Sequence, residues 1–183
     1  MAVRRQAPAF IDMRIELERC VLRDWQRSDK ESLVPLANNF NIARNLSHRF
    51  PHPYGEADAE AWFSMLESQA QTAHLAIEVA GRAAGGIGIR MGEGVFARSA
   101  ELGYWLGEPY WGRGIMTEAV SAFAPYAMAH FALIRVYAYA DVGNSGSMRV
   151  LEKAGFLREG ITRASAFKYG KAVDRVLYAR VVT

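Results

Sequence analysis

The sequence contains a single cysteine, Cys20, and no other cysteine or histidine near it at the spacing of metal ligands. One cysteine forms no internal disulfide and cannot by itself hold a structural zinc ion. Apolar runs of about 18 residues, the length that spans a membrane, are absent too. The first apolar stretch is broken by Arg14, Glu16, Glu18 and Arg19. We therefore expect a cytoplasmic protein without redox or metal chemistry, a signal peptide or a membrane span.

The chain also lacks a large excess of charge of either sign. The 22 Lys and Arg residues exceed the 19 Asp and Glu residues by a net charge of +3, and they are dispersed along the chain. Because no polybasic run or recognition motif is present, we expect no nucleic-acid partner. The mild positive charge indicates only that an anionic small molecule is an acceptable ligand.

The composition that remains is typical of one globular domain. The chain has 183 residues, of which 51% are hydrophobic and 22% charged. This length gives one sizeable core and little room for a second. We expect a loosely ordered N-terminal segment over residues 1–17 and one domain over residues 18–183, as a monomer or a homodimer.

Apolar spacing predicts the order of the secondary structure. Period-two alternation and helical spacing succeed each other several times along the chain. The predicted elements are a strand at 20–22, helices near 33–37 and 57–69, strands at 75–79, 86–89 and 100–106, a helix from 114, a strand at 134–140, a helix at 147–154, and strands at 156–161 and 167–182. Entry into the last strand through a turn at Tyr169-Gly170-Lys171 is the alternative. This order predicts an α/β fold in a single domain, with a mixed, mostly antiparallel central sheet of about six to seven strands flanked by helices.

A glycine turn stands where one predicted strand gives way to a helix. Its sequence is Trp111-Gly112-Arg113-Gly114-Ile115-Met116. Free amides and the helix dipole make such a turn a site for a phosphate or pyrophosphate, although a plain glycine turn is an open alternative. A P-loop would place Lys-Ser/Thr where Ile115 and Met116 stand, and a dinucleotide fingerprint would place glycine at Thr117. Both nucleotide motifs are therefore disfavoured.

Five linked motifs carry a resemblance to a known family. They are Tyr104-Trp105-Leu106, the run from Tyr110 to Gly114, Thr117-Glu118-Ala119, Asn144-x-x-Ser147 and Glu152-Lys153-x-Gly155-Phe156. Together they resemble the Gcn5-related N-acetyltransferases, and within them the RimJ/RimL-type ribosomal-protein N-terminal acetyltransferases, over residues 18–182. The resemblance implies an acyl-CoA N-acyltransferase fold with acetyl-CoA as cosubstrate.

The resemblance also implies the residues that bind acetyl-CoA. Backbone amides of the glycine turn would hold the pyrophosphate, and the strand at 102–106 would run beside the pantetheine in a gap between two splayed strands. Asn144 would form a hydrogen bond to the pantetheine arm. The side chains of Arg113, Arg149 and Lys153 would contact phosphates, and solvated surface charges are the alternative for each of them. The implied cofactor-binding residues are Leu102, Tyr104, Trp105, Leu106, Gly112, Arg113, Gly114, Ile115, Met116, Asn144, Ser147, Arg149 and Lys153.

Two residues depart from the family pattern. Pro109 stands where Gln or Arg is favoured, and Leu151 stands where many members carry a tyrosine general acid. In the RimJ/RimL-like branch, a serine at Ser147 resembles the group that serves the leaving thiolate, and a glutamate at Glu101 resembles the base. The structural alternatives are a Glu101 carboxylate paired with an arginine and a Ser147 that bonds helix backbone.

Acceptor basicity favours one class of amine. An α-amine with a pKa of about 7.7–8.0 costs about 1 kcal/mol to neutralise at pH 7, whereas a lysine ε-amine costs about 4.6 kcal/mol. We therefore expect a protein N-terminus as the acceptor. Polyamines, antibiotics such as aminoglycosides, and a catalytically silent acyl-CoA binding or sensing module remain alternatives.

The acceptor side is assigned to one loop. Residues 38–54 contain His48, Arg49 and His52, which we expect to contact the acceptor together with Tyr104. A solvated loop without a role in binding is the alternative.

Overall fold

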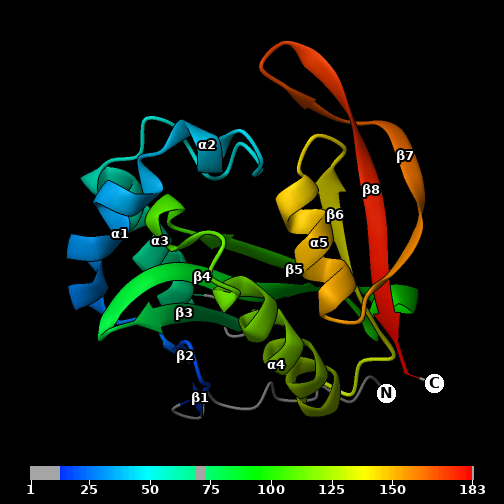
Figure 1. Ribbon diagram of the computed structural model, residues 1–183, viewed down its shortest axis with the longest axis horizontal. Coiled ribbons are helices and arrows are strands. Elements are labelled where there is room, and N and C mark those ends of the chain that lie inside the picture. Colours follow the sequence, from blue (N-terminus) through cyan, green and yellow to red (C-terminus); the bar gives the residue numbers. More distant parts are fainter. Residues whose placement is uncertain (1–12, 69–72, 183) are drawn as a thin grey trace.

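The computed structural model describes residues 13–68 and 73–182, which form an eight-stranded sheet with helices packed on it (Figure 1). The strand order is β1-β2-β3-β4-β5-β6-β8-β7. The strands are β1 (Arg14–Glu16), β2 (Val21–Asp24), β3 (Ala73–Val79), β4 (Arg82–Met91), β5 (Ser99–Leu106), β6 (Arg135–Asp141), β7 (Leu157–Lys168) and β8 (Lys171–Val181). The helices are α1 (Lys30–Ala37), α2 (Phe40–Ala43), α3 (Glu56–Ser68), α4 (Ile115–His130) and α5 (Ser145–Lys153), with short 3-10 turns η1 (Arg27–Asp29), η2 (Gly94–Phe96) and η3 (Glu108–Tyr110).

The predicted α/β class and the mixed, mostly antiparallel sheet are confirmed, because every neighbouring pair of strands except β5 and β6 is antiparallel. The sheet has eight strands, one more than the upper end of the predicted range of about six to seven. The additional strand is β1, which pairs with β2 and lies within residues 1–17, expected to be loosely ordered. Three residues are too few to give an alternation signal. Residues 1–12 lie outside the described residues, as does position 69, the expected end of the second helix.

The C-terminal hairpin differs from its prediction. The sequence predicts strands at 156–161 and 167–182, whereas β7 runs on to Lys168 and β8 begins at Lys171, next to the turn given as the alternative entry into the last strand. The two-residue turn is Tyr169-Gly170, with φ of 49° and 76°. Within β7 the register shifts between Thr162 and Ala166, and this irregular polar stretch hides the continuity of the strand from a period-two pattern.

Two hydrophobic clusters lie on opposite faces of the sheet. On β5, Leu102 and Leu106 belong to the cluster that α4 covers, whereas Trp105 packs against the cluster of α1 and α3. The predicted alternation of side chains along this strand is therefore confirmed. Cys20 is buried in the α4 cluster, and burial, together with the charge of Glu118, raises the pKa of its thiol to about 11.

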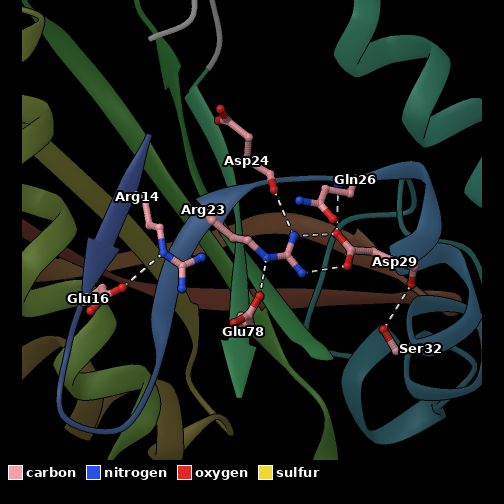
Figure 2. A network of polar contacts seen from close by, with 8 residues as sticks. All are labelled: Arg14, Glu16, Arg23, Asp24, Gln26, Asp29, Ser32 and Glu78. Carbon is pink, nitrogen blue, oxygen red and sulfur yellow. Dashed lines mark hydrogen bonds and ion pairs between the residues drawn. The ribbon is translucent and has the colours of Figure 1, made fainter. Parts of the chain in front are cut away.

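A buried ionic network ties β2 to β3 and to the start of α1 (Figure 2). The Arg23 guanidinium donates to both carboxylate oxygens of Asp29 at 2.7 Å and to Glu78 at 2.5 Å. It also donates to the Asp24 carbonyl oxygen at 2.9 Å, while Asp29 accepts from the backbone amide of Gln26 at 2.8 Å. The arginine is only 7% exposed. Its donors are therefore shared among three chain segments.

The sheet opens between its two parallel strands. β5 and β6 pair only over residues 99–101 and 135–137, and beyond Glu101 and Tyr137 they diverge, as Figure 1 shows. This is the gap that the family resemblance implies.

Neither a membrane-crossing helix nor a metal cluster is found in residues 13–68 and 73–182. No helix there is both long and apolar enough to cross a membrane, and no group of three or more His, Cys, Asp or Glu residues is arranged to hold a metal ion.

Candidate active site

The glycine turn lies between η3 and the first turn of α4. Gly112 and Gly114 adopt φ of 75° and 78°, a backbone conformation that side chains disfavour. Gly114 is the N-cap of α4, and no side chain caps this helix. The first intrahelical hydrogen bond runs from the Glu118 amide to the Gly114 carbonyl oxygen at 3.0 Å. The amides that precede Glu118 have no intrahelical acceptor, so they are available to an anion.

The side chains around the turn divide into buried and exposed groups. Ile115 and Met116 are buried in the core, so only their backbone amides can face a ligand. Arg113 is exposed, with its guanidinium carbon 5.8 Å from the centroid of the Tyr110 ring. Trp111 is half-exposed, and its indole nitrogen donates to the Leu106 carbonyl oxygen at 2.7 Å.

Sequence reasoning missed Arg19 as a neighbour of the turn. Its Nε atom lies 3.6 Å from the position that a Cβ on Gly114 would occupy. The backbone amides of Glu18 and Arg19 donate to the Glu118 carboxylate, each at 2.9 Å, which fixes this segment beside α4. Because the two residues of this contact lie 99 positions apart, no local pattern points to it.

The turn gives a first prediction. Gly112→Val is expected to weaken acetyl-CoA binding by roughly tenfold, about 1.4 kcal/mol, because a branched side chain would cover the amides. Calorimetric titration measures the change. Gly170→Val is the matched control, since Gly170 has φ of 76° and open space around it but lies in the β7–β8 turn. Equal affinity of both variants for acetyl-CoA would contradict an anion site at Gly112.

The open edge of β5 presents backbone groups to the gap. The Gly107 amide donates to the Ala84 carbonyl oxygen at 2.8 Å, and the register with β4 is regular from Met91 to Gly85. Hydrogen-bonded pairs alternate along an antiparallel ladder, so the backbone groups of Leu102, Tyr104 and Leu106 point away from β4. The Leu106 carbonyl oxygen already accepts a hydrogen bond from the Trp111 indole nitrogen. The Leu102 amide closes the last pair with β6, at Tyr137, so the Leu102 carbonyl oxygen and both backbone groups of Tyr104 face the gap where β6 has diverged.

At the start of α5, Ser147 contacts both Asn144 and Tyr104. The Asn144 side chain caps the helix, accepting from the Ser147 amide at 3.1 Å through its Oδ1 atom. The Ser147 Oγ atom lies 2.7 Å from the Tyr104 hydroxyl oxygen, and the phenol also lies 3.3 Å from the Ser147 carbonyl oxygen. Burial raises the pKa of Tyr104. The sequence singled out all three residues but not the bond between the two hydroxyls.

Glu101 lies at the point where the gap begins. It is the last residue of β5 that pairs with β6, opposite Tyr137, and on the β4 side it lies opposite Arg90. Its carboxylate pairs with the Arg90 guanidinium, so the arrangement weighed as the structural alternative for this residue is present. Burial, and next the charge of Glu101, raises the pKa of Tyr137. Tyr137 was missed, although it occupies an alternating position in the predicted strand.

The remaining predicted cofactor residues contribute in different ways. Leu102 and Leu106 have buried side chains, and the Trp105 ring packs 5.3 Å from Phe50, so none of the three side chains lies in the gap. Of these residues, Leu102 presents its backbone carbonyl oxygen to the gap, whereas the Trp105 backbone faces β4. Arg149 and Lys153 are exposed on α5 one turn apart, and neither forms an ion pair with any described residue. Leu151 is fully buried beneath them.

The predicted acceptor loop approaches the C-terminal hairpin. His48, Arg49 and His52 are exposed in the segment after α2. The His52 ring lies 5.5 Å from Phe40, and Phe40 lies 5.4 Å from Tyr169 in the β7–β8 turn. Figure 1 shows α2 and this hairpin on the two sides of the diverging strands. The structure thus brings His52 toward the hairpin but gives His48 and Arg49 no ring or ionic contact among the described residues.

Comparisons with curated proteins give relatives that are similar in sequence. The chain is 40% identical over 82 residues to YdaF of Bacillus subtilis (strain 168), a candidate ribosomal N-acetyltransferase by name, covering 45% of each chain. It is 33% identical over 85 residues to the ribosomal-protein-serine acetyltransferase of Escherichia coli (strain K12), covering 46% of this chain and 48% of that protein. The chain spans less than half the length of each of these curated relatives.

A solved structure and a family profile complete the comparison. RimL, a ribosomal L7/L12 alpha-N-protein acetyltransferase in complex with coenzyme A, superimposes with a TM-score of 0.79 at 21% identity, covering 93% of this chain and 98% of that chain. The model of the acetyltransferase (GNAT) domain family matches residues 19–157. This match includes β2 to α5, the glycine turn and the gap between β5 and β6. The chain therefore belongs to the GNAT acetyltransferase family.

Proposed function

We propose that this protein transfers an acetyl group from acetyl-CoA to a primary amine, and that the acceptor is the α-amine of a protein N-terminus. The observation that carries the proposal is the gap beside Glu101. It is bordered by open backbone groups of β5 and lies next to a helix, α4, whose N-terminus no side chain caps. An elongated ligand with an anionic end and an amide-containing arm fits this arrangement.

The binding roles follow from the groups that face outward. The amides of residues 112–116 hold the pyrophosphate, with the Arg113 and Arg19 cations beside it. The backbone of Leu102 and Tyr104 pairs with the amides of the pantetheine arm, and the Asn144 side-chain nitrogen is a further donor, since its oxygen caps α5. Arg149 and Lys153 are placed for the more distant phosphate.

The reaction needs a base, oxyanion donors and a group at the leaving sulfur. Glu101 takes the proton of the attacking amine, directly or through one water, after its carboxylate leaves Arg90. As the new N–C bond forms, a backbone amide of β5 faces the oxyanion. The C–S bond then breaks, and the Ser147 hydroxyl donates a hydrogen bond to the departing thiolate. The proton that Glu101 took from the amine passes through water to the thiolate, which gives the free thiol.

The choice of an α-amine rests on acceptor basicity and on the relatives. A single carboxylate suits an amine that costs about 1 kcal/mol to neutralise at pH 7 better than one that costs about 4.6 kcal/mol. The RimL structure is named for an alpha-N-protein acceptor, and the Escherichia coli relative is named for a ribosomal protein. The loop with His48, Arg49 and His52 and the β7–β8 turn flank the acceptor.

A thiol-release screen tests this function. Peptides with free N-termini, polyamines and aminoglycosides are supplied with acetyl-CoA, and free coenzyme A is measured. We expect kcat/KM for the best N-terminal peptide to exceed that for every small amine. A small amine as the best substrate would overturn the acceptor class, and acetyl-CoA binding without thiol release would favour a silent binding module.

A further inference from the structure

We propose that Tyr104 is a positioning residue that aims the Ser147 hydroxyl at the leaving sulfur. The inference rests on the proposed acetyl transfer and adds a second side chain to its leaving-group end. Tyr104 comes from β5 and Ser147 from α5, on opposite sides of the gap. The hydrogen bond between their hydroxyl oxygens, at 2.7 Å, joins β5 to the first turn of α5.

The direction of this hydrogen bond decides its effect. A phenol, with a usual pKa near 10, is a stronger donor than an aliphatic hydroxyl, and the serine oxygen is the better acceptor. The phenol has one proton and two acceptors within reach, and we assign that proton to the Ser147 Oγ atom, at 2.7 Å, rather than to the Ser147 carbonyl oxygen, at 3.3 Å. The serine's own proton then rotates away from the phenol. The Ser147 hydroxyl then has its proton available for a third group in the gap, which in the proposed reaction is the sulfur.

Burial keeps Tyr104 in the state that this role needs. The raised pKa of Tyr104 maintains the neutral phenol at ordinary pH, so that it remains a donor. A buried tyrosinate is disfavoured for the same reason, so the phenol keeps its proton throughout the reaction. Donation to the Oγ atom polarises the serine hydroxyl and strengthens its own donation. Tyr104 thus acts through Ser147 and breaks no bond itself.

The helix geometry leaves Ser147 dependent on this partner. The capping interaction with Asn144 uses the Ser147 backbone amide, not its hydroxyl. The hydroxyl has Tyr104 as its one hydrogen-bonding side chain among the described residues. Without the phenol, the Ser147 hydroxyl would rotate freely or turn toward a nearby carbonyl oxygen of α5. Its donation to the sulfur would then be one of several competing states.

Tyr104→Phe removes only the phenol oxygen. We expect kcat to fall about tenfold, the effect of one lost hydrogen bond in the transition state, while KM for acetyl-CoA changes less than about twofold. The matched control is Tyr178→Phe, because the buried Tyr178 hydroxyl donates to Glu152 of α5 at 2.7 Å. It removes a similar bond to the same helix, and we expect its kcat to match that of the wild type.

A double-mutant cycle separates positioning from a general structural role. Ser147→Ala is expected to lower kcat at least as much as Tyr104→Phe, and adding Tyr104→Phe to it should cause no further loss. Additive losses would overturn the inference, because Tyr104 would then act independently of Ser147. Wild-type kcat in Ser147→Ala would also overturn it, even if Tyr104→Phe failed to fold.

The same assay distinguishes failure of this inference from failure of the proposed function. Thiol release is measured with the best acceptor and with water alone, since both reactions expel the same sulfur. No release by the wild-type protein under either condition would contradict acetyl transfer itself. Release by the wild type and equal release by Tyr104→Phe would overturn only the role of Tyr104.

Discussion

Replacing Arg23 by methionine is expected to lower the free energy of unfolding by about 3–5 kcal/mol. The guanidinium contacts Asp29 and Glu78, and its side chain is only 8% exposed, with 7% and 17% for the two carboxylates. Methionine fills most of the arginine volume but leaves both carboxylates without a cation. One buried and one partly buried carboxylate, both without a cation, are more costly than the loss of the attraction alone would suggest.

Thermal unfolding measures this loss. At about 2–4 °C per kcal/mol for a chain of this size, the melting temperature should fall by roughly 6–20 °C. Arg27→Met is the matched control. Arg27 lies three residues before α1 begins and also pairs with two carboxylates, those of Glu60 and Glu67, but its ion pairs are exposed. We expect little change in its melting temperature, since exposed ion pairs contribute little. An equal, small change in both variants would show that the Arg23 network does not stabilise the fold.

Replacing Glu101 by glutamine is expected to lower kcat by about a hundredfold, within the usual contribution of a general base. The amide is nearly isosteric and cannot take the proton of the attacking amine. Affinity for acetyl-CoA should remain close to that of the wild type, because the binding groups lie on the glycine turn and the β5 backbone. Steady-state kinetics with the best acceptor and calorimetry with acetyl-CoA provide the two measurements.

Arg90→Gln is the control that separates the base from the ion pair. This variant removes the Arg90–Glu101 pair but leaves the carboxylate in place. If Glu101 is the base, Arg90→Gln retains most of its activity while Glu101→Gln does not. If both variants lose activity equally, the pair supports the sheet and the base is another group.

The fold was predictable where one pattern repeated over many residues. The alternation along β5 placed Leu102 and Trp105 on the correct faces, and the helical spacing in α3 and α4 gave these helices within a few residues. β1 has three residues and gains its structure from pairing with β2, so its own sequence carries little signal. The irregular stretch of β7 is likewise set by its partner strand.

The site was predictable where a single segment forms it. The glycine turn supplies its own amides and its own helix N-terminus, so the local sequence determines its capacity to bind an anion. The contacts of Ser147 with Tyr104 and of Arg19 with Glu118 join residues 43 and 99 positions apart. Such pairs depend on how α5 and the N-terminal segment pack, which local periodicity does not encode.

Competition between two amines of one peptide tests acetyl transfer to a protein N-terminus. A peptide with a free N-terminus and one internal lysine is incubated with the protein and acetyl-CoA, and the acetylated position is located by tandem mass spectrometry. The α-amine and the ε-amine then compete within one molecule. The proposed acetyl transfer predicts one acetyl group on the α-amine, dependent on Glu101. Acetylation of the lysine side chain, or an unmodified peptide while small amines are acetylated, would contradict it.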